Sequence, residues 1–458
     1  MGDAPTGGYR AVPSDTDTSA VDSDPNAMDG RHKRLGRRKK NFKNHDEAWF
    51  AANDTKCWTR FRFLCFWGSI VCMFAACVLA GVLIFLMPRN CDPDLEWYQG
   101  NVIMDVRPRN LDDLKNLDLK SFKELGVKTL HLKLGYPNLK AQRTETEIDQ
   151  IRRFFQRVHA TNLTIIIQVP VVSENSTTLD MELEHQVDYA IQFWIESGAD
   201  GIFLDGLESF DVNIWVARKI SYWHGLLDRY AINETLSKIL MTSYKFAKDL
   251  TEKVSEEDAS EALAKISLLD ANLDLDLKTN ITHLEADMER ITRWDTIKSR
   301  PWINWNLDTS TYPLNNAAVA LQMLLPGTIN LKEAVAENQN ALQNMTSLRA
   351  LAVPIYMNGN YKRCDCDEGL TKEVNYVISQ PLEETIQLER FYNRRNRFVL
   401  VANFGGEDVN LGPVGQIYAG GELVLDTSKR LPVNNGEVVK FSLIELAPGE
   451  AIVIKLPK

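Results

Sequence analysis

The chain has 458 residues, of which 44% are hydrophobic and 25% are charged, with 52 basic against 62 acidic side chains. These proportions are ordinary for globular proteins and exclude a chain that is disordered throughout. Residues 89–458 carry 40 basic and 53 acidic side chains. This negative balance argues against a nucleic acid or another polyanion as the partner of that region.

Residues 1–62 form a polar N-terminal segment. Its first thirty positions are rich in Asp, Ser, Thr, Gly and Pro and poor in large apolar side chains, so they cannot bury enough surface to fold. A basic cluster follows between residues 31 and 43. Such a cluster is compatible with nucleic-acid binding or a localisation signal, but next to a membrane segment it is more simply a topology signal attracted to anionic lipid. We expect a largely disordered cytoplasmic tail, basic near the membrane.

Residues 63–87 form a run of 25 residues without a charge. A helix of this length, rising about 1.5 Å per residue, is long enough to cross a hydrocarbon core of roughly 30 Å. A buried core helix is the alternative, but such helices are shorter. A cleaved signal peptide would begin near the N-terminus. We therefore expect a transmembrane signal-anchor helix at 63–87, followed by a neck at 88–100.

The charges that flank this segment predict its orientation, because cytoplasmic flanks retain Lys and Arg. Downstream only Arg89 precedes Asp92 and Asp94. The N-terminus is thus expected in the cytoplasm and the region beyond residue 88 outside, as in a type II single-pass protein of the plasma membrane. Asn53 begins an Asn-X-Ser/Thr triplet that should stay unmodified. Five further triplets lie on the outer side and are candidate N-glycosylation sites, at Asn162, Asn175, Asn233, Asn280 and Asn344.

Three of the seven cysteines fall outside the membrane, at Cys91, Cys364 and Cys366. An odd number of cysteines in an oxidising compartment suggests a disulfide to another chain. A disulfide between Cys364 and Cys366 is possible in a strained ring and would leave Cys91, just past the anchor, for an interchain disulfide. A free or intrachain Cys91 is the alternative.

From residue 101 to about 384, short apolar runs alternate with helical patterns such as 111–125, 145–159 and 183–197. The eight expected strands are 102–106, 127–134, 163–171, 201–205, 239–244, 266–270, 302–307 and 324–329. Continuously apolar strands separated by helices favour a parallel sheet closed as a (β/α)8 barrel. An open doubly wound sheet is the alternative, although no Gly-rich phosphate loop supports it.

The pattern changes in residues 385–458, where alternating strands are separated by turns rich in Gly, Pro, Asn and Asp. The expected strands are 398–404, 421–425, 438–443 and 451–456. We expect a small C-terminal antiparallel β-sandwich.

Several segments carry a family resemblance. Gly198-Ala-Asp-Gly-Ile-Phe-Leu-Asp205 resembles the fourth barrel strand of the α-amylase family of glycoside hydrolases, in which a β-sandwich follows the barrel. Together with the type II anchor, Cys91 and Trp97-Tyr98, it resembles the heavy-chain glycoprotein subunits of heteromeric amino-acid transporters. The resemblance covers about residues 55–458 and includes Arg300-Pro-Trp-Ile-Asn-Trp, Leu325-Pro-Gly-Thr and Phe398-Val-Leu-Val-Ala-Asn-Phe-Gly405.

The residues that correspond to the family's catalytic centre are incomplete. A retaining glycosidase needs two carboxyl groups about 5 Å apart. Asp205 matches the nucleophile, although a strand-end Asp is often only a helix cap, and Phe203 replaces the supporting arginine. Residues 239–246 offer no acid/base carboxylate, and residues 167–172 are expected to have lost every polar group lining the site. Asp308 on the seventh strand remains without its histidine. Asp205 and Asp308 are therefore expected to be vestigial.

The resemblance implies a non-catalytic heavy chain. Such a subunit pairs through Cys91 and the transmembrane helix with a multi-spanning amino-acid transporter light chain, and supports its stability and trafficking to the plasma membrane. Its expected surroundings are that light chain and membrane lipid, with no nucleic acid, cofactor or metal. The alternatives are a membrane-anchored α-glycosidase, for which Asp205 and Asp308 argue, and an adhesion or receptor ectodomain.

Overall fold

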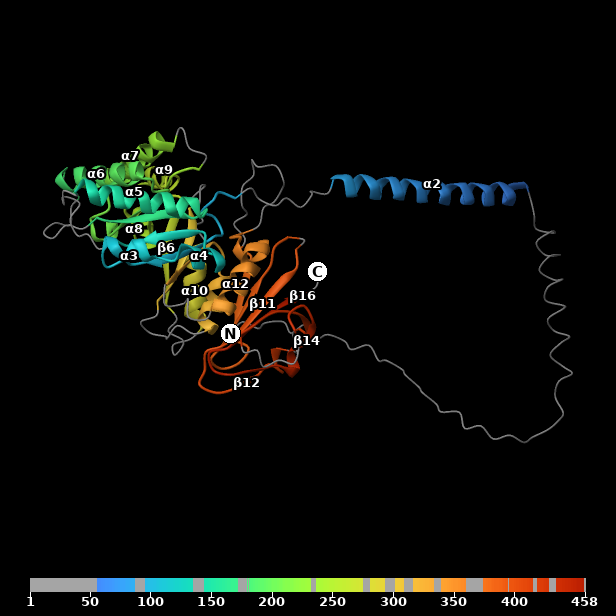
Figure 1. Ribbon diagram of the computed structural model, residues 1–458. Coiled ribbons are helices and arrows are strands. Elements are labelled where there is room, and N and C mark those ends of the chain that lie inside the picture. Colours follow the sequence, from blue (N-terminus) through green and yellow to red (C-terminus); the bar gives the residue numbers. More distant parts are fainter. Residues whose placement is uncertain are drawn as a thin grey trace, which may run out of the picture. The chain divides into compact units, whose positions relative to one another are not determined.

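The structure is a computed structural model (Figure 1). It describes residues 56–86, 95–134, 144–171, 179, 181–231, 236–274, 281–292, 301–308, 316–332, 339–359, 374–393, 395–414, 418–427 and 434–456. The chain divides into two compact units, Met1–Met87 and Pro88–Lys458.

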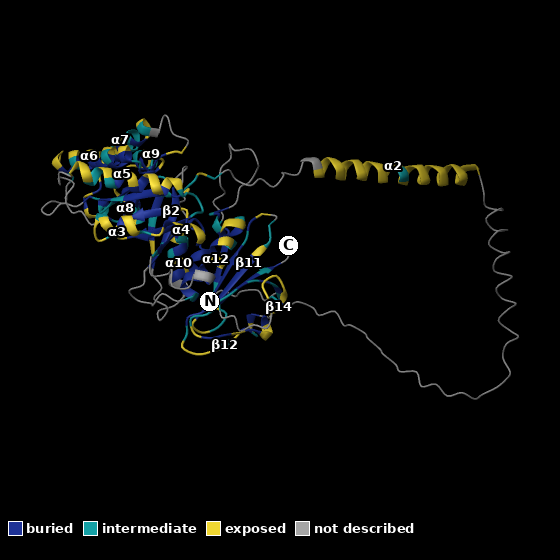
Figure 2. Cartoon of the chain, viewed as in Figure 1, coloured by how far each residue is buried: buried dark blue, intermediate teal, exposed yellow. Residues whose placement is uncertain are grey.

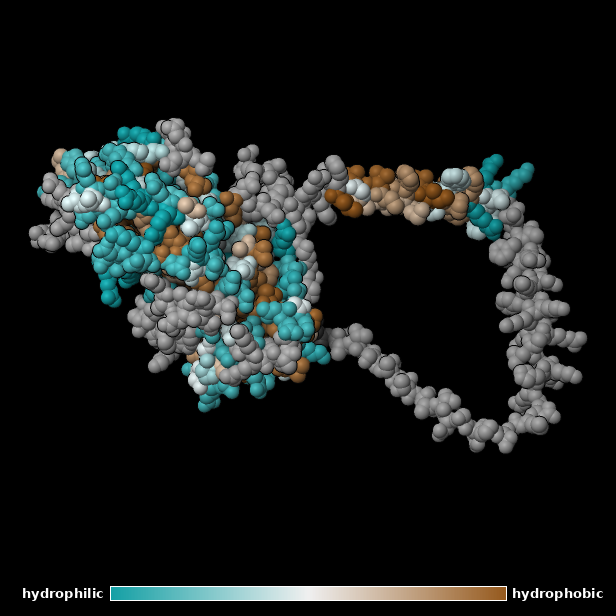
Figure 3. All heavy atoms as spheres, viewed as in Figure 1, coloured by the Kyte–Doolittle hydropathy of each residue, from teal (hydrophilic) through white to brown (hydrophobic). Residues whose placement is uncertain are grey.

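The described part of the first unit is one helix, α2, at Lys56–Leu86. The segment Lys56–Ile84 has a mean hydropathy of 2.3, and none of it is buried within the protein. Figure 3 shows hydrophobic side chains along most of this helix and a hydrophilic end. A helix that is apolar on all sides and long enough to cross a bilayer fits a membrane anchor. The prediction of an apolar segment long enough to cross a membrane is confirmed, and the helix begins before residue 63.

The second unit contains a closed barrel of eight parallel strands, in the order β1 to β8. β1 pairs with both β2 and β8, which confirms the closed barrel over the open sheet. The strands are β1 Val102–Val106, β2 Thr129–Leu132, β3 Thr164–Pro170, β4 Gly201–Asp205, β5 Ile239–Ser243, β6 Leu268–Asp274, β7 Trp302–Asp308 and β8 Thr328–Lys332.

Helices connect the strands and cover the barrel (Figure 2). They are α3 Leu111–Asn116, α4 Leu119–Glu124, α5 Glu145–Ala160, α6 Met181–Ser197, α7 Ile214–Ala231, α8 Tyr244–Lys253, α9 Glu256–Leu263, α10 Ile281–Thr292, α11 Asn316–Leu324, α12 Gln339–Leu351 and α13 Val353–Tyr356. A short 3-10 helix, Leu207–Ser209, follows β4.

Several expected boundaries were wrong, among them those of the first helical segment and of the eighth strand. The single helix expected at 111–125 is two helices, because Leu117 is extended and Asp118 caps α4 by accepting hydrogen bonds from the backbone N–H groups of Lys120 and Ser121. The eighth strand begins at Thr328 and not near residue 324. Leu324 ends α11, and Gly327 takes a positive φ of 106° before the strand.

The C-terminal region forms an antiparallel sheet in the order β14-β13-β16-β11-β10-β9, with a two-stranded sheet of β12 and β15. The four expected strands there are confirmed, except that residues 441–443 form a 3-10 helix. Four further strands, β9, β10, β12 and β15, were missed. The bounds are β9 Tyr376–Ser379, β10 Thr385–Arg390, β11 Arg397–Asn403, β12 Val409–Asn410, β13 Gly420–Asp426, β14 Val438–Lys440, β15 Glu445–Leu446 and β16 Ala451–Leu456.

Alternate residues of β11 divide the sheet's two faces between two cores. Leu400 and Ala402 belong to the large core that also contains the barrel helices. Val399 and Val401 belong to a smaller core within the C-terminal region. The sheet therefore packs one face against the barrel and covers the other with its own loops and short strands, as the period of two along a strand requires.

A third cluster fills the interior of the barrel near the amino ends of the strands. It includes Ile103, Ile166, Ile239, Leu268 and Trp302. The inward positions that follow along the strands are largely polar, which is unusual for a barrel interior filled by branched apolar side chains. This change from apolar to polar side chains positions the site described next.

Candidate functional site

A cavity of about 540 Å³ opens where the carboxyl ends of the barrel strands meet. This end of a (β/α)8 barrel carries the active site in characterised enzymes of this fold. Its lining residues are Asp105, Arg107, Lys133, Gln168, Phe203, Asp205, Glu208, Ser243, Asp270, Asn272, Asn306, Leu307 and Lys332.

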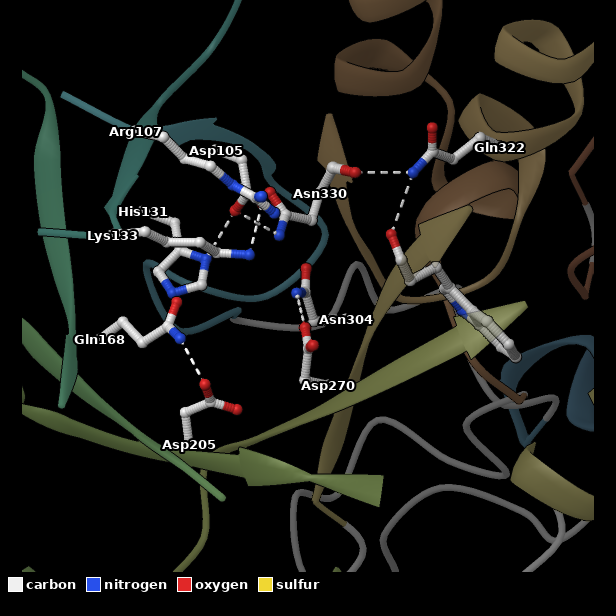
Figure 4. A network of polar contacts seen from close by, with 11 residues as sticks. Asp105, Arg107, His131, Lys133, Gln168, Asp205, Asp270, Asn304, Gln322 and Asn330 are labelled. Atoms are coloured by element: carbon white, nitrogen blue, oxygen red, sulfur yellow. Dashed lines mark hydrogen bonds and ion pairs between the residues drawn. The ribbon is translucent and has the colours of Figure 1, made fainter. Parts of the chain in front are cut away.

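Asp105 is the centre of a polar network beneath this cavity (Figure 4). Its carboxylate lies 2.7 Å from Nδ1 of His131 and 2.6 Å from Nζ of Lys133, and it accepts a hydrogen bond of 2.8 Å from Nδ2 of Asn330. Burial opposes ionisation of Asp105, but the hydrogen bonds and positive charges of His131 and Lys133 outweigh it and hold the pKa of Asp105 well below its ordinary value. Asp105 is therefore a permanently charged anchor for its neighbours.

Asp205 ends β4 and lines the cavity, where its carboxylate accepts a hydrogen bond from Nε2 of Gln168. The expectation that the third strand has lost every polar group lining the site is thus wrong at Gln168. Phe203 also lines the cavity, and its ring lies edge-on against His131 at 5.3 Å. Phe203 carries no charge, so it packs against His131 and does not offset the charge of Asp205.

Asp270 on β6 is a carboxylate of the cavity that sequence reasoning missed. It accepts a hydrogen bond of 2.7 Å from Nδ2 of Asn304 and another from Asn306. Desolvation by the surrounding protein raises the pKa of Asp270, although His131, the two amides and Lys133 oppose this shift. A carboxylate that lines a cavity and has a raised pKa is typical of a general acid or of a ligand-binding group.

Ser243 ends β5 and lines the cavity. Its hydroxyl donates a hydrogen bond of 2.9 Å to Glu208, and it caps α8 by accepting one from the backbone N–H of Phe246. Glu208 comes from the short helix after β4, so it brings a carboxylate toward β5 from the neighbouring loop. The residues that line the cavity therefore include four carboxylates, from Asp105, Asp205, Glu208 and Asp270.

The remaining predicted site residues are spread over the chain. Asn162, with a positive φ of 60°, and Asn344 on α12 are both exposed and accessible to modification. Asp308 ends β7 in register with Asp274, but its side chain lies outside the described part of the structure. Cys91, Cys364, Cys366, Asn175, Asn233 and Asn280 also lie outside the described residues.

Metal binding has no candidate among the described residues, since no three His, Cys, Asp or Glu side chains are grouped as metal ligands there. The polar groups of the cavity instead suit direct contacts with an organic ligand. Amides, ammonium groups and carboxylates in one concave site provide the few placed polar groups that fix a small molecule.

We expect Asp270→Asn to stabilise the second unit by roughly 0.5–2 kcal/mol, the usual gain when a costly functional group is neutralised. Because the folded pKa is raised above 3.8, the native state retains a proton that the unfolded chain releases. Stability should therefore fall as pH rises from 3.8 through the raised pKa. Urea unfolding across this pH range checks both effects. Equal stability of the two proteins at all pH values would contradict the interpretation.

Among the comparisons with known proteins, only the one with solved structures finds similar chains, and it shows the fold. No protein-family model and no curated protein matches the chain. A pullulanase from Paenibacillus barengoltzii, solved with maltohexaose and α-cyclodextrin, matches 81% of this chain and 78% of its own at 10% identity, with a TM-score of 0.51. The fold is that of the α-amylase-like glycosidases. Eubacterium rectale Amy13B matches 80% of this chain and 97% of its own, also at 10% identity, with a TM-score of 0.49.

Proposed function

We propose that this chain is the non-catalytic heavy chain of a heteromeric amino-acid transporter. Anchored by α2 in the plasma membrane with its C-terminus outside, it binds a multi-spanning light chain through Cys91 and the membrane helix, and supports that partner's stability and trafficking. The observation that carries the proposal is the glycosidase-like barrel in which Phe203, within β4, and Ser243, at the end of β5, replace the arginine and the carboxylic acid that catalysis would need.

The anchor supports the same proposal. The helix α2 exposes large apolar side chains on all sides, such as Phe74 and Leu79, so it needs lipid or another membrane helix around it. One helix cannot form a path for amino acids, and the transport path would belong to the light chain. Small residues along α2, including Gly68 and Gly81, have open space beside them, which would allow a partner helix to approach closely.

A membrane-anchored α-glycosidase is the second candidate, and Asp270 is the observation that favours it. In this alternative Asp205 would be the nucleophile and Asp270, with its raised pKa, the acid. Two features argue against it. Amide groups of Asn304 and Asn306 donate to the Asp270 carboxyl, which favours its charged form, and Asp205 is held by a neutral glutamine.

The variant Asp205→Asn separates the two candidates. We expect it to restore amino-acid uptake to cells lacking this chain as fully as the wild type does, because the barrel contributes no bond cleavage. Purified wild type and variant should also release 4-nitrophenol from 4-nitrophenyl α-glucoside at the same background rate. A glycosidase would instead lose roughly 10²–10⁴-fold in rate, and wild-type turnover abolished by the variant would contradict the proposal. Surface labelling confirms equal amounts of both proteins.

A further inference from the structure

The walls of the barrel cavity carry opposite charges. Arg107 after β1, Lys133 after β2 and Lys332 on β8 belong to three consecutive strands of the closed barrel. Asp105 lies among them and is paired with Lys133 at 2.6 Å, so three cations stand against one carboxylate on this side. Arg107 is 67% exposed and 3.9 Å from Asp105. Its guanidinium therefore retains capacity for a ligand.

The other wall is acidic. The cavity residues described on β4 to β7 and the loop after β4 include the carboxylates of Asp205, Glu208 and Asp270 and no cation. Their present partners are neutral side chains, namely Gln168, Ser243 and Asn304. Asp205 and Glu208 have only neutral hydrogen-bond partners here, so these two carboxylates attract a cationic group to this wall, whereas burial raises the pKa of Asp270.

Polar atoms beneath the cavity are short of partners. Nε2 of His131 and the Oδ1 atoms of Asn304 and Asn330 are buried, with side chains at most 2% exposed, and make no hydrogen bond within the described structure. Figure 4 shows these three residues close to Asp105, Gln168 and Asp270. Buried polar atoms are nearly always paired in native proteins, with protein, water or ligand. The layer below the cavity is therefore polar, although none of these three side chains lines the cavity itself.

We propose that this cavity binds a small zwitterion, such as a free amino acid, with its carboxylate toward Arg107 and Lys332 and its ammonium group toward Asp205 and Glu208. A volume of about 540 Å³ lies within the range of small-molecule sites, roughly 300–1,000 Å³. Two separated charges of opposite sign select a ligand with both charges, because a singly charged or neutral molecule leaves one wall unpaired. The raised pKa of Asp270 supports a binding site here, because a buried carboxylate that lowers the stability of the fold is typically retained at a functional site. Binding here requires no light chain.

Titration calorimetry of the full-length protein in detergent micelles tests the proposal. The probes are two zwitterions of different length, L-alanine and 6-aminohexanoate, with hexanoate and hexylamine as singly charged analogues and maltose as the neutral polyol. We expect at least one zwitterion to bind roughly tenfold or more tightly than either analogue. Equal binding of the analogues, tighter binding of maltose, or no saturable binding of either zwitterion at millimolar concentration would overturn the proposal.

Two variants test which wall of the cavity binds the carboxylate of the ligand and which binds its ammonium group. Arg107→Gln should weaken binding of the zwitterion and of hexanoate without affecting hexylamine, whereas Glu208→Gln should weaken the zwitterion and hexylamine without affecting hexanoate. Arg152→Gln and Glu261→Gln remove equal charges at exposed helix positions and should leave all affinities unchanged. Opposite selectivity of the two cavity variants cannot come from general loss of structure. Equal effects on both analogues would overturn the assignment.

Discussion

Replacing Arg349 by methionine should lower the free energy of unfolding of the second unit by roughly 3–5 kcal/mol. The guanidinium, on α12, is 1% exposed and donates hydrogen bonds to the carbonyl oxygens of Met323 at 2.7 Å and Leu325 at 2.9 Å, and to that of Gly327. Burial lowers the pKa of Arg349 to about 9, which leaves it charged at neutral pH. Methionine would leave these carbonyl groups buried without donors.

The contacts of Arg349 explain why the effect should be large. They join the end of α11 to the turn that begins β8, and a further hydrogen bond of 3.3 Å reaches the carbonyl oxygen of Gly100 before β1. The barrel closes between β8 and β1, so this one side chain supports the closing joint. Gly327 in that turn has no room for a side chain, because an added Cβ would lie 2.6 Å from the carbonyl oxygen of Ile303.

Urea unfolding of the full-length protein in detergent, followed by near-UV circular dichroism, measures the loss. Arg349→Lys keeps the charge but not the forked donors and should fall between wild type and Arg349→Met. Arg152→Met, at an exposed position of α5, is the matched control and should change stability by less than about 0.5 kcal/mol. A loss for Arg349→Met no larger than that of the control would show that the buried guanidinium does not hold the joint.

The second large effect is expected in the membrane helix. Phe74 and Val78 lie one turn apart near its middle, and both are exposed. Arginine near a bilayer centre costs roughly 2.5–3.5 kcal/mol on translocon-based scales, so the double variant Phe74→Arg/Val78→Arg should no longer insert. Its exposed sequons at Asn162 and Asn344 would then remain unglycosylated, and alkaline carbonate would extract the protein from membranes.

Phe74→Leu/Val78→Leu is the control, because it changes the same positions and keeps the helix apolar. We expect this variant to be resistant to carbonate and glycosylated like the wild type. Glycans on the double arginine variant, together with resistance to carbonate, would mean that α2 is not the segment that anchors the chain. Glycosylation at Asn53 would mean that the predicted orientation is reversed.

The barrel could be predicted from the sequence because its strands are continuously apolar and its helices are periodic. β1 and β4 have the bounds that the sequence predicts. The split between α3 and α4 was missed because the spacing of apolar residues by three and four continues across Leu117. In the structure α3 ends before Leu117, and Asp118 caps the start of α4. β10 was missed because Thr385–Arg390 places Gln387, Glu389 and Arg390 in buried positions, which a hydrophobic pattern cannot reveal. The four-residue strand β9, which pairs with β10, was missed with it.

The site was less predictable than the fold. Asp205 was found through the resemblance of its strand to a known family, while Asp105, Glu208 and Asp270 were not. A carboxylate at a strand end has the same appearance in sequence whether it faces solvent or a cavity, and only the closure of the barrel brings β1, β4 and β6 around one space. The signal in the sequence that could have predicted the site was the polar residues toward the carboxyl ends of several apolar strands, since these positions form the active site in enzymes of this fold.

The central claim is that a second membrane protein is bound covalently at Cys91. The most direct test compares surface-labelled protein on a non-reducing gel and on a reducing gel. The samples are the wild type, Cys91→Ser and, as a matched control on α2, Cys57→Ser. The proposal predicts a larger band that falls to monomer size on reduction, disappears in Cys91→Ser, persists in Cys57→Ser and yields a multi-spanning transporter by mass spectrometry. A wild-type protein that runs as a monomer under both conditions would contradict it.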